Sequence, residues 1–234
     1  MALYAISDLH LSNSVSKPMD VFGGKWQGYM EKIQKNWTHL VSDDDTVVIG
    51  GDISWGINLE QALADFQMIE RLPGKKIILK GNHDLWWSTV RKMTQFLEAH
   101  EIHSIEFLFN NCFVYGDTGI CGTRGWFFEE DFKESHDEKI FRRELIRLET
   151  SLKAAKQQNV SEIICFLHYP PLYTGYKCEE MLRLLQQYDV KKCYYGHLHG
   201  GTAHARAVQG ERDGTEFSLV SADYLRFRPK KILE

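Results

Sequence analysis

Short apolar runs recur along the chain, and five of them stop at residues that can bind a divalent metal. The runs, each with the residues that follow it, are LYAIS before Asp8 and His10, TVVIGG before Asp52, KKIILKG before Asn82, His83 and Asp84, EIICFL before His168, and KKCYYG before His197 and His199. Short apolar runs of this kind are typical of buried strands. In open α/β sheets the side chains just beyond the carboxyl ends of the strands share one rim, so this pattern predicts one site made from distant segments.

Segments with apolar residues three and four positions apart alternate with these runs and predict helices. The predicted helices cover residues 26–41, 58–71, 134–158 and 178–187. Strands that alternate with helices predict parallel strands joined by right-handed crossovers, and therefore an α/β fold. Residues 12–25 are rich in Ser, Gly and Pro, which predicts a loop over the rim.

Two later segments have a different pattern. Residues 105–123 contain short runs separated by Gly and Asp, which predicts an antiparallel meander. Residues 203–221 predict a hairpin with Asp213 and Gly214 in its turn. The sequence therefore predicts parallel strands first and antiparallel strands later.

The composition is that of a globular protein, with 43% hydrophobic and 26% charged residues. A length of 234 residues suits a single domain, 1–234. The 28 Lys and Arg residues against 32 Asp and Glu residues give a net charge of −4 without a basic block. This balance does not favour nucleic-acid binding, which needs basic side chains to neutralise phosphates.

Nothing in the sequence predicts a membrane segment, and no protein partner is evident. No run approaches the roughly 20 apolar residues that cross a bilayer. The first apolar run lacks a basic leader and is too short for a signal peptide. The five cysteines form no C-x-x-C pair, which favours reduced thiols and a cytoplasmic protein.

Two pairs of candidate ligands have the same spacing. If the extended conformation continues beyond the strand, Asp8 and His10 face the same way and converge on one ion. His197 and His199 are expected to repeat this geometry, since the neighbouring glycines allow the backbone to turn tightly.

The remaining candidates complete a set of nitrogen and oxygen ligands. The two oxygens of the Asp52 carboxylate can bridge two cations, Asn82 adds an amide oxygen, and His168 adds a nitrogen. A ligand set without thiolate suits Mn²⁺, Fe or Zn²⁺. Two such ions leave the site positively charged after two carboxylates and a bridging hydroxide, which favours a phosphorylated substrate.

The order of these residues resembles that of the calcineurin-like metallophosphoesterases. The family's blocks D-x-H, G-D, G-N-H-[DE], H and G-H-x-H correspond to DLH at 8–10, GD at 51–52, GNHD at 81–84, His168 and GHLH at 196–199. The resemblance implies two mixed β-sheets packed face to face with helices on the outside, a four-layer sandwich. It implies two metals, one held by Asp8, His10, Asp52 and His199, the other by Asp52, Asn82, His168 and His197. It also implies that His83 protonates the leaving group and that Asp84 orients the His83 imidazole.

One departure narrows the resemblance. The protein phosphatases of this superfamily continue the second block as G-D-x-x-D-R-G, whereas this chain reads GDISWG, with Trp55 and Gly56 in place of the acid and the base. The chain looks closer to the compact bacterial phosphohydrolases. The expected activity is hydrolysis of a phosphomonoester or phosphodiester of a small substrate by a metal-bridging hydroxide. The alternatives are a non-catalytic metal-binding regulatory or scaffold protein, and a nuclease.

Further candidates lie close to the blocks in sequence. Arg124 follows the run ending in CGT and is expected either to bind phosphoryl oxygens bidentately or to form a surface ion pair. The tryptophans near the motifs and near Arg124 are expected to pack in the core or rim, with a stacking wall for a base or sugar as the alternative. They are Trp55, Trp86, Trp87 and Trp126.

Overall fold

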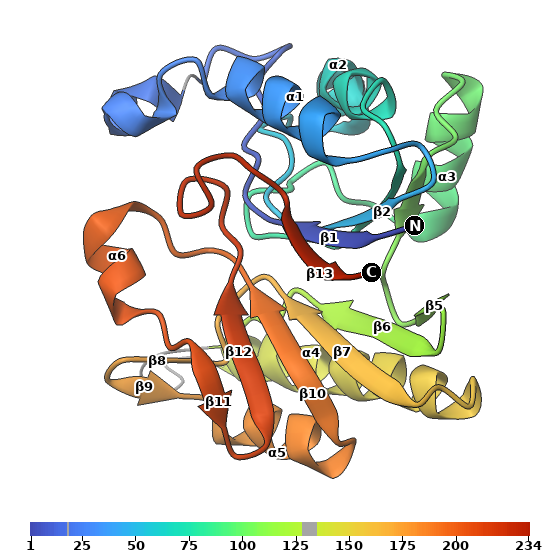
Figure 1. The fold of residues 1–234 in the computed structure, drawn as a ribbon, viewed down its shortest axis with the longest axis vertical. Helices are drawn as coiled ribbons and strands as arrows, with labels where there is room; N and C mark the ends of the chain where they lie inside the picture. The colour runs from blue at the N-terminus through green and yellow to red at the C-terminus, as the bar shows by residue number, and fades with distance from the viewer. Residues whose placement is uncertain (18, 128–134) are drawn as a thin grey trace. The chain divides into compact units, whose positions relative to one another are not determined.

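The computed structural model describes residues 1–17, 19–127 and 135–234, which form two compact units. Unit 1 consists of Met1–Phe107 and Val220–Glu234, and unit 2 consists of Leu108–Leu219. Figure 1 shows the ribbon coloured along the chain. Each unit has its own mixed β-sheet and its own helices.

The described residues of unit 1 build a five-stranded sheet in the order β13-β1-β2-β3-β4. Its strands are β1 (Leu3–Ile6), β2 (Thr46–Ile49), β3 (Lys75–Ile78), β4 (Ile105–Phe107) and β13 (Lys230–Leu233). Strands β1 to β4 run parallel, and β13 pairs antiparallel with β1. The loops after β1, β2 and β3 therefore leave neighbouring strands at the same end of the sheet.

Helices follow the first three strands of unit 1 and pack on one face of its sheet (Figure 1). They are α1 (Tyr29–Leu40), α2 (Leu59–Glu70) and α3 (Val90–Ala99), with the short 3₁₀ turns η1 (Met19–Phe22) and η2 (Gly24–Trp26) before α1. Side chains of all three helices share one apolar cluster with the sheet, among them Ile33, Trp37, Phe66, Ile69, Met93 and Leu97. Burial of these apolar stripes holds the helices against the sheet.

The described residues of unit 2 build a six-stranded sheet in the order β11-β12-β10-β7-β6-β5, with a separate pair, β8-β9. Its strands are β5 (Phe113–Tyr115), β6 (Thr118–Thr123), β7 (Glu162–Leu167), β8 (Leu172–Tyr173), β9 (Tyr176–Lys177), β10 (Val190–Tyr195), β11 (Gly210–Arg212) and β12 (Thr215–Leu219). The four central strands run parallel, and the edge strands β5 and β11 are antiparallel to their neighbours.

The helices of unit 2 are α4 (Ser135–Gln157), α5 (Glu179–Gln187) and α6 (Gly200–Arg206). In the view of Figure 1, α4 lies behind the parallel strands. Apolar residues of α4 and α5 share a buried cluster with three cysteines that stand in register on neighbouring strands, Cys121, Cys165 and Cys193. This cluster is the core of unit 2.

The structure confirms the predicted α/β class with two mixed sheets and helices. Packing of the sheets face to face, and a single domain, stay predictions. The helices predicted at 58–71 and 178–187 are α2 and α5. The helix predicted at 26–41 begins later, at Tyr29, because Gly28 has a left-handed φ of 59°. The helix predicted at 134–158 is α4, and its predicted first residue lies outside the described residues.

The predicted meander over residues 105–123 is wrong. Strand β4 runs parallel to β3 in unit 1, and β6 runs parallel to β7 in unit 2. Within residues 105–123, the antiparallel pairing is therefore confined to β5 and β6. Gly and Asp show where a chain turns, but distant segments decide which strands pair.

The predicted hairpin over residues 203–221 is half right. Strands β11 and β12 pair antiparallel around Asp213 and Gly214, whose φ values of 51° and 83° suit a tight hairpin turn. The segment before them, up to Arg206, belongs to α6 and not to a strand. The edge strand β13 has no counterpart in the sequence prediction.

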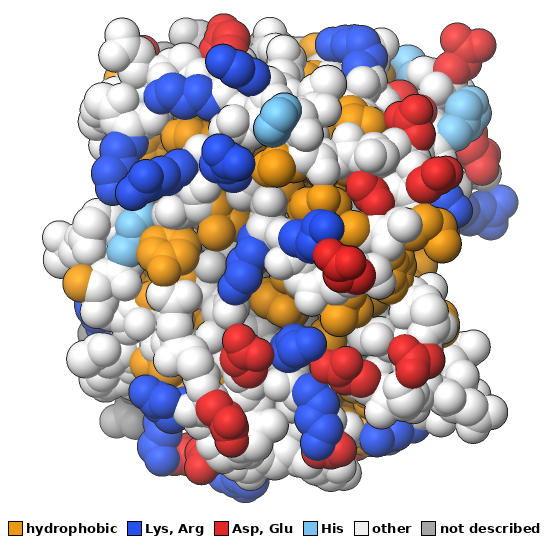
Figure 2. Space-filling model, in the orientation of Figure 1, with side chains coloured by type: hydrophobic (Ala, Val, Ile, Leu, Met, Phe, Trp, Pro, Cys, Tyr) orange, Lys and Arg blue, Asp and Glu red, His pale blue; other side chains and the backbone are white. Residues whose placement is uncertain are grey.

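The surface carries both signs of charge. On the face shown in Figure 2, Lys and Arg side chains mix with Asp and Glu side chains in the lower half, while several Lys and Arg side chains gather at the upper left. No helix in the described part of the chain is both long enough and apolar enough to cross a membrane.

Candidate metal centre

Unit 1 brings six of the predicted site residues into the loops after three adjacent parallel strands. Asp8 and His10 follow β1, Asp52 follows β2, and Asn82, His83 and Asp84 follow β3. Because these strands leave the sheet at the same end, the three loops lie together. The prediction that distant segments converge is thus confirmed within unit 1.

Asp8, His10 and Asp52 form a buried group of potential ligands. One ligand atom of Asp8 lies within 4.8 Å of one from His10, and within 4.8 Å of one from Asp52. His10 Nε2 lies 3.7 Å from Asp52 Oδ2, and all three residues are at most 2% exposed. Two carboxylates buried side by side repel each other unless a cation compensates them. Their oxygens and the imidazole nitrogen fit Mn²⁺, Fe or Zn²⁺.

The backbone of these three residues is left-handed, with φ values of 61° at Asp8, 47° at His10 and 52° at Asp52. The expected continuation of the extended conformation beyond β1 is therefore wrong. Hydrogen bonds between the two loops impose the turn, since Asp8 N donates to Gly51 O and His10 N donates to Asp52 O, each at 2.9 Å. Non-glycine residues in this region cost of order 1–3 kcal/mol each and are concentrated at functional sites.

Asp84 ties the loop after β2 to the loop after β3. Its buried carboxylate accepts hydrogen bonds from the backbone N–H groups of Asp52 (2.9 Å), Ile53 (2.8 Å) and Gly81 (2.7 Å). It also accepts one from Trp86 Nε1 at 3.0 Å. Asp84 thus fixes the backbone that presents Asp52, and orientation of the His83 imidazole by Asp84 stays a prediction.

Close backbone approach makes glycine necessary at position 81. A Cβ atom there would lie 2.1 Å from Asp52 Oδ1, so no larger residue fits without moving the carboxylate. The same oxygen accepts a hydrogen bond from His83 N at 2.7 Å. The backbone at His83 is therefore tied directly to the Asp52 carboxylate.

The His83 ring lies in an aromatic group with His10 and Trp55. The His83 ring centroid is 4.5 Å from that of Trp55 and 5.6 Å from that of His10. Trp55 also stacks on His10, at 4.9 Å and an interplanar angle of 24°. The other three tryptophans near the motifs pack within or against the two apolar clusters: Trp86, Trp87 and Trp126.

A second layer of polar residues, which the sequence analysis missed, supports these loops. Asp65 on α2 is fully buried and accepts hydrogen bonds from Ser54 Oγ and from the backbone N–H of Asn13, the latter at 2.9 Å. Burial raises the pKa of Asp65, against the effect of these hydrogen bonds. An acid beside Phe66 within the apolar stripe of a helix was the signal available in the sequence.

Tyr29 on α1 supports the loop after β1. Its hydroxyl donates to the backbone oxygen of His10 at 2.6 Å, and burial raises the pKa of Tyr29 to about 12. The phenol therefore stays protonated and remains a donor at neutral pH. Nothing in the local sequence marked this tyrosine, because the bond joins residues of separate elements.

Unit 2 brings His168 and His197 together. His168 is buried at the end of β7, and its ring centroid is 5.2 Å from that of His197. Gly196 N donates to His168 O at 3.1 Å and joins the ends of β10 and β7. His197 has a left-handed φ of 69°, whereas His199 has an extended φ of −118° at the start of α6. The expected repeat of the Asp8 and His10 geometry is therefore wrong.

Arg124 lies beside His168 in the fold of unit 2. Its backbone oxygen accepts hydrogen bonds from His168 N at 3.2 Å and Tyr169 N at 3.0 Å. Its guanidinium Nη2 lies 3.4 Å from Oε1 of Glu144, a fully buried carboxylate. This ion pair is partly buried and not an open surface pair, while contact with phosphoryl oxygens stays a prediction.

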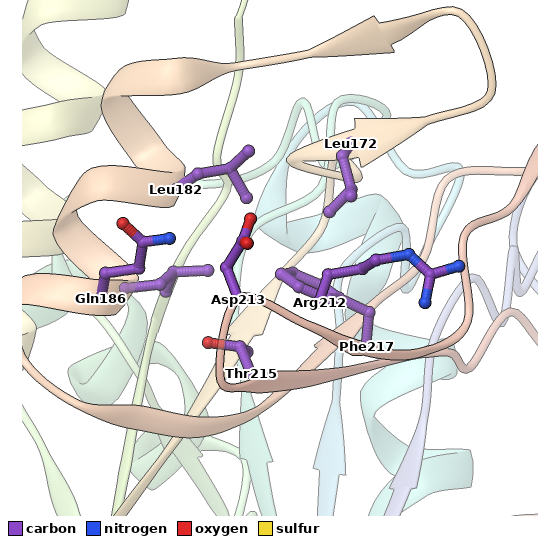
Figure 3. A pocket seen from close by; sticks show the side chains of 8 residues that line it. Leu172, Leu182, Gln186, Arg212, Asp213, Thr215 and Phe217 are labelled. Atoms are coloured by element: carbon purple, nitrogen blue, oxygen red, sulfur yellow. The ribbon is translucent and has the colours of Figure 1, made fainter.

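A small pocket in unit 2 is a poor candidate for a substrate site. It holds about 20 Å³ and contains none of the predicted site residues. The residues that line it, most of them labelled in Figure 3, are Leu172, Leu182, Leu185, Gln186, Arg212, Asp213, Thr215 and Phe217. That volume holds on the order of one water molecule, which is far too little for a phosphoester.

Comparison with known proteins matches the chain to one family over most of its length. The model of the calcineurin-like phosphoesterases matches residues 1–201, a range that includes all five sequence blocks. No curated protein matches the chain.

A solved structure shows the same fold at low identity. A phosphopantetheinyl hydrolase from Mycobacterium tuberculosis has 16% identity and a TM-score of 0.58, over 99% of this chain and 95% of that chain. A protein of unknown function from Aquifex aeolicus has 16% identity and a TM-score of 0.48, over 98% of this chain and 95% of that chain. At such identities the likeness of the first structure shows the fold alone.

Proposed function

We infer that this chain, which belongs to the calcineurin-like phosphoesterase family and is a metal-dependent phosphoesterase, hydrolyses a phosphomonoester or a phosphodiester of a small phosphorylated substrate. The observation that carries this proposal is the buried group of Asp8, His10 and Asp52 on left-handed backbone. A protein that needed these residues only for packing would not bury two carboxylates side by side.

Two divalent ions are proposed, of Mn, Fe or Zn, with the ligands that the family pattern implies. One ion would be held by Asp8, His10, Asp52 and His199, and the other by Asp52, Asn82, His168 and His197. When bound, the ions would supply the nucleophile and stabilise the charge that develops on the phosphoryl group. The hydrogen bond from His83 N to Asp52 Oδ1 restrains the carboxylate that is proposed to bridge them.

His83 is proposed to give its proton to the leaving-group oxygen. Its ring is half-buried beside the His10 ring, while its backbone is fixed to Asp52. A general acid must come within hydrogen-bond reach of the oxygen that it protonates, so a restrained position suits this role. Arg124 is proposed to bind the phosphoryl oxygens, since its planar guanidinium suits bidentate binding.

The proposed setting is the cytoplasm, with a small phosphorylated molecule as the partner and neither nucleic acid nor a membrane. All five cysteines are free, which supports a reducing compartment. The 28 Lys and Arg residues against 32 Asp and Glu residues do not favour binding to a nucleic-acid backbone.

The test is a screen of metal-free protein resupplied with Mn²⁺, Fe²⁺ or Zn²⁺, against p-nitrophenyl phosphate, bis(p-nitrophenyl) phosphate and DNA. We expect hydrolysis of at least one ester and two bound ions per chain. Metal binding without turnover of either ester would favour the regulatory or scaffold alternative. Turnover of nucleic acid alone would favour the nuclease.

The variant Asp52→Asn tests the bridging role. We expect it to lose both ions together, because the amide has only one oxygen to offer. Asp213→Asn is a matched control, since Asp213 is an exposed aspartate with nearly the same φ, 51° against 52°. Loss of only one ion in Asp52→Asn would contradict the bridge.

A further inference from the structure

Trp55 contacts three residues of unit 1, among them a candidate ligand and the proposed general acid. Its ring stacks on His10, lies 4.5 Å from the His83 ring, and has Lys17 Nζ over it at 5.1 Å from the centroid. Its backbone is fixed as well, because Trp55 N donates to Leu11 O at 2.9 Å. The indole therefore stands in a defined place beside the proposed general acid.

The contacts argue against an indole that stacks on a substrate base or sugar. His10 and Lys17 already occupy faces of the ring, so a base would have to displace one of them. His10 is buried and its backbone is hydrogen-bonded to Asp52, which makes displacement on that side costly. The Trp55 ring therefore packs against residues of the chain itself and not against a substrate.

The indole N–H has no comparable role. Trp55 Nε1 is buried and has no hydrogen-bond partner among the residues that the structure describes. A buried donor without a partner is unfavourable, so the N–H group does not explain why a tryptophan stands here. What this position requires is the flat aromatic surface.

Asp84, the residue after His83, supports the backbone of the site. Asp84 accepts hydrogen bonds from the backbone of Asp52, Ile53 and Gly81, and so holds the loops. The Trp55 indole packs directly against the His83 ring. Trp55 also stands where the resemblance places an acid in the protein phosphatases, so an aromatic ring here takes the position of a charged group.

We propose that Trp55 is a positioning residue, which by ring packing holds the His83 imidazole in the orientation needed to protonate the leaving group. This inference rests on the proposed function, because it assumes that His83 is the general acid. A general acid must meet the leaving oxygen at about 2.6–3.2 Å, so a His83 ring that rotates freely would protonate it less often. Packing by a phenyl ring should serve nearly as well as packing by an indole.

Nuclear magnetic resonance of the metal-free protein tests the geometry without any turnover. An aromatic ring beside His83 shifts the resonances of its carbon-bound ring protons. We expect Trp55→Phe to keep much of this shift and Trp55→Leu to abolish it, with the His100 signals unchanged in both. His83 resonances that are the same in Trp55→Leu and in the wild type would overturn the proposal.

Kinetics with two leaving groups test the consequence. On an alkyl phosphoester, Trp55→Leu should lower turnover by roughly 10- to 100-fold, part of what general acid catalysis contributes. The loss should be smaller on p-nitrophenyl phosphate, whose phenol leaves without a proton, and Trp55→Phe should restore most of the activity. Equal losses on both esters, or no rescue by Phe, would make Trp55 a merely structural residue.

One control variant and the magnetic-resonance measurement separate this inference from the proposed function. Trp87→Leu removes an indole that packs on Trp86 and Phe107, and it should lower stability without any dependence on the leaving group. If the wild type hydrolyses no ester, the proposed function fails and the assignment of Trp55 to catalysis fails with it. The magnetic-resonance result then still decides whether the Trp55 ring packs against the His83 ring.

Discussion

The two units hold their predicted ligands in different ways. In unit 1, Asp8, His10 and Asp52 are buried on left-handed backbone, in loops that are hydrogen-bonded to one another. In unit 2, His168 is buried at a strand end, whereas His197 and His199 are half-buried and His199 precedes a seven-residue helix. The candidate ligands of unit 1 are therefore held more rigidly by the surrounding chain than those of unit 2.

One buried carboxylate in each unit, Asp84 in unit 1 and Glu144 in unit 2, accounts for part of the difference in how the candidate ligands are held. Asp84 in unit 1 accepts bonds mainly from backbone N–H groups, so it fixes the course of two loops. Glu144 in unit 2 accepts one backbone bond, from Gly125 at 3.2 Å, and otherwise binds the side chains of Thr123, Arg124 and Arg147. A carboxylate that binds backbone restrains the chain, whereas one that binds flexible side chains mainly restrains those side chains.

The largest expected effect comes from His83, the proposed acid of unit 1. His83→Ala should keep its metal content and lower turnover of an alkyl ester by roughly 10²- to 10⁴-fold. The loss should shrink for an activated phenol, as steady-state kinetics with both esters would show. His100→Ala changes an exposed histidine of the same unit and serves as the control. Loss of metal in His83→Ala would show that His83 is a metal ligand, and would contradict its assignment as the general acid.

A smaller effect is expected from the buried carboxylates. Asp84→Asn turns one acceptor into a donor that faces backbone N–H groups, and should cost about 1–3 kcal/mol of unfolding free energy. Since it displaces Asp52, it should also weaken metal binding by about 10- to 100-fold. Urea unfolding and metal titration measure the two effects.

The matching change in unit 2 is Glu144→Gln, which should weaken metal binding less than Asp84→Asn does, because Glu144 restrains mainly side chains. If Glu144→Gln weakened metal binding as much as Asp84→Asn does, the candidate ligands of unit 2 would be held as rigidly as those of unit 1. The contrast between the two units would then be wrong.

Arg124 should give an effect of about tenfold. Arg124→Lys keeps the charge but loses the planar fork, so kcat/KM should fall by about 10-fold, equivalent to about 1.4 kcal/mol, with unchanged metal content. Arg147→Lys, which alters another arginine bound to Glu144, is the control. Equal activity of both variants and the wild type would assign Arg124 to its ion pair alone.

Tyr29→Phe should have the smallest effect, about 1 kcal/mol of stability at pH 8, from one lost hydrogen bond to His10 O. The pKa of Tyr29 is raised from 10.0 to about 12, so between these pH values the folded state binds more protons than the unfolded state. Wild-type stability should therefore fall relative to the variant as the pH rises from 10 to 12. Urea unfolding across this range measures the difference, and a constant difference would contradict the assignment.

Much of the fold and of the candidate site could be predicted from local sequence. Helix α2 was predictable because Leu59, Phe66 and Ile69 recur at helical spacing and Asn58 caps its first turn. The candidate ligands Asp8, Asp52 and His168 could be selected because each follows a buried strand in the order of a known family. Such signals lie within a few residues, so the sequence displays them directly.

Strand partners could not be predicted in the same way. The pairing of β4 with β3, and of β6 with β7, depends on segments that the intervening chain brings together. Helix α6 was missed because a seven-residue helix that begins with two glycines has little helical pattern of its own.

The sequence by itself determined which residues can carry the chemistry and in which loops they stand. Only the tertiary structure decided how they are held: the left-handed turns at Asp8 and Asp52, the backbone bonds to Asp84, and the packing of Trp55 against His83. The physical reason is that hydrogen bonds and ring contacts between distant residues fix these features. A left-handed turn at an aspartate is locally unfavourable, and it persists because the surrounding bonds leave no alternative.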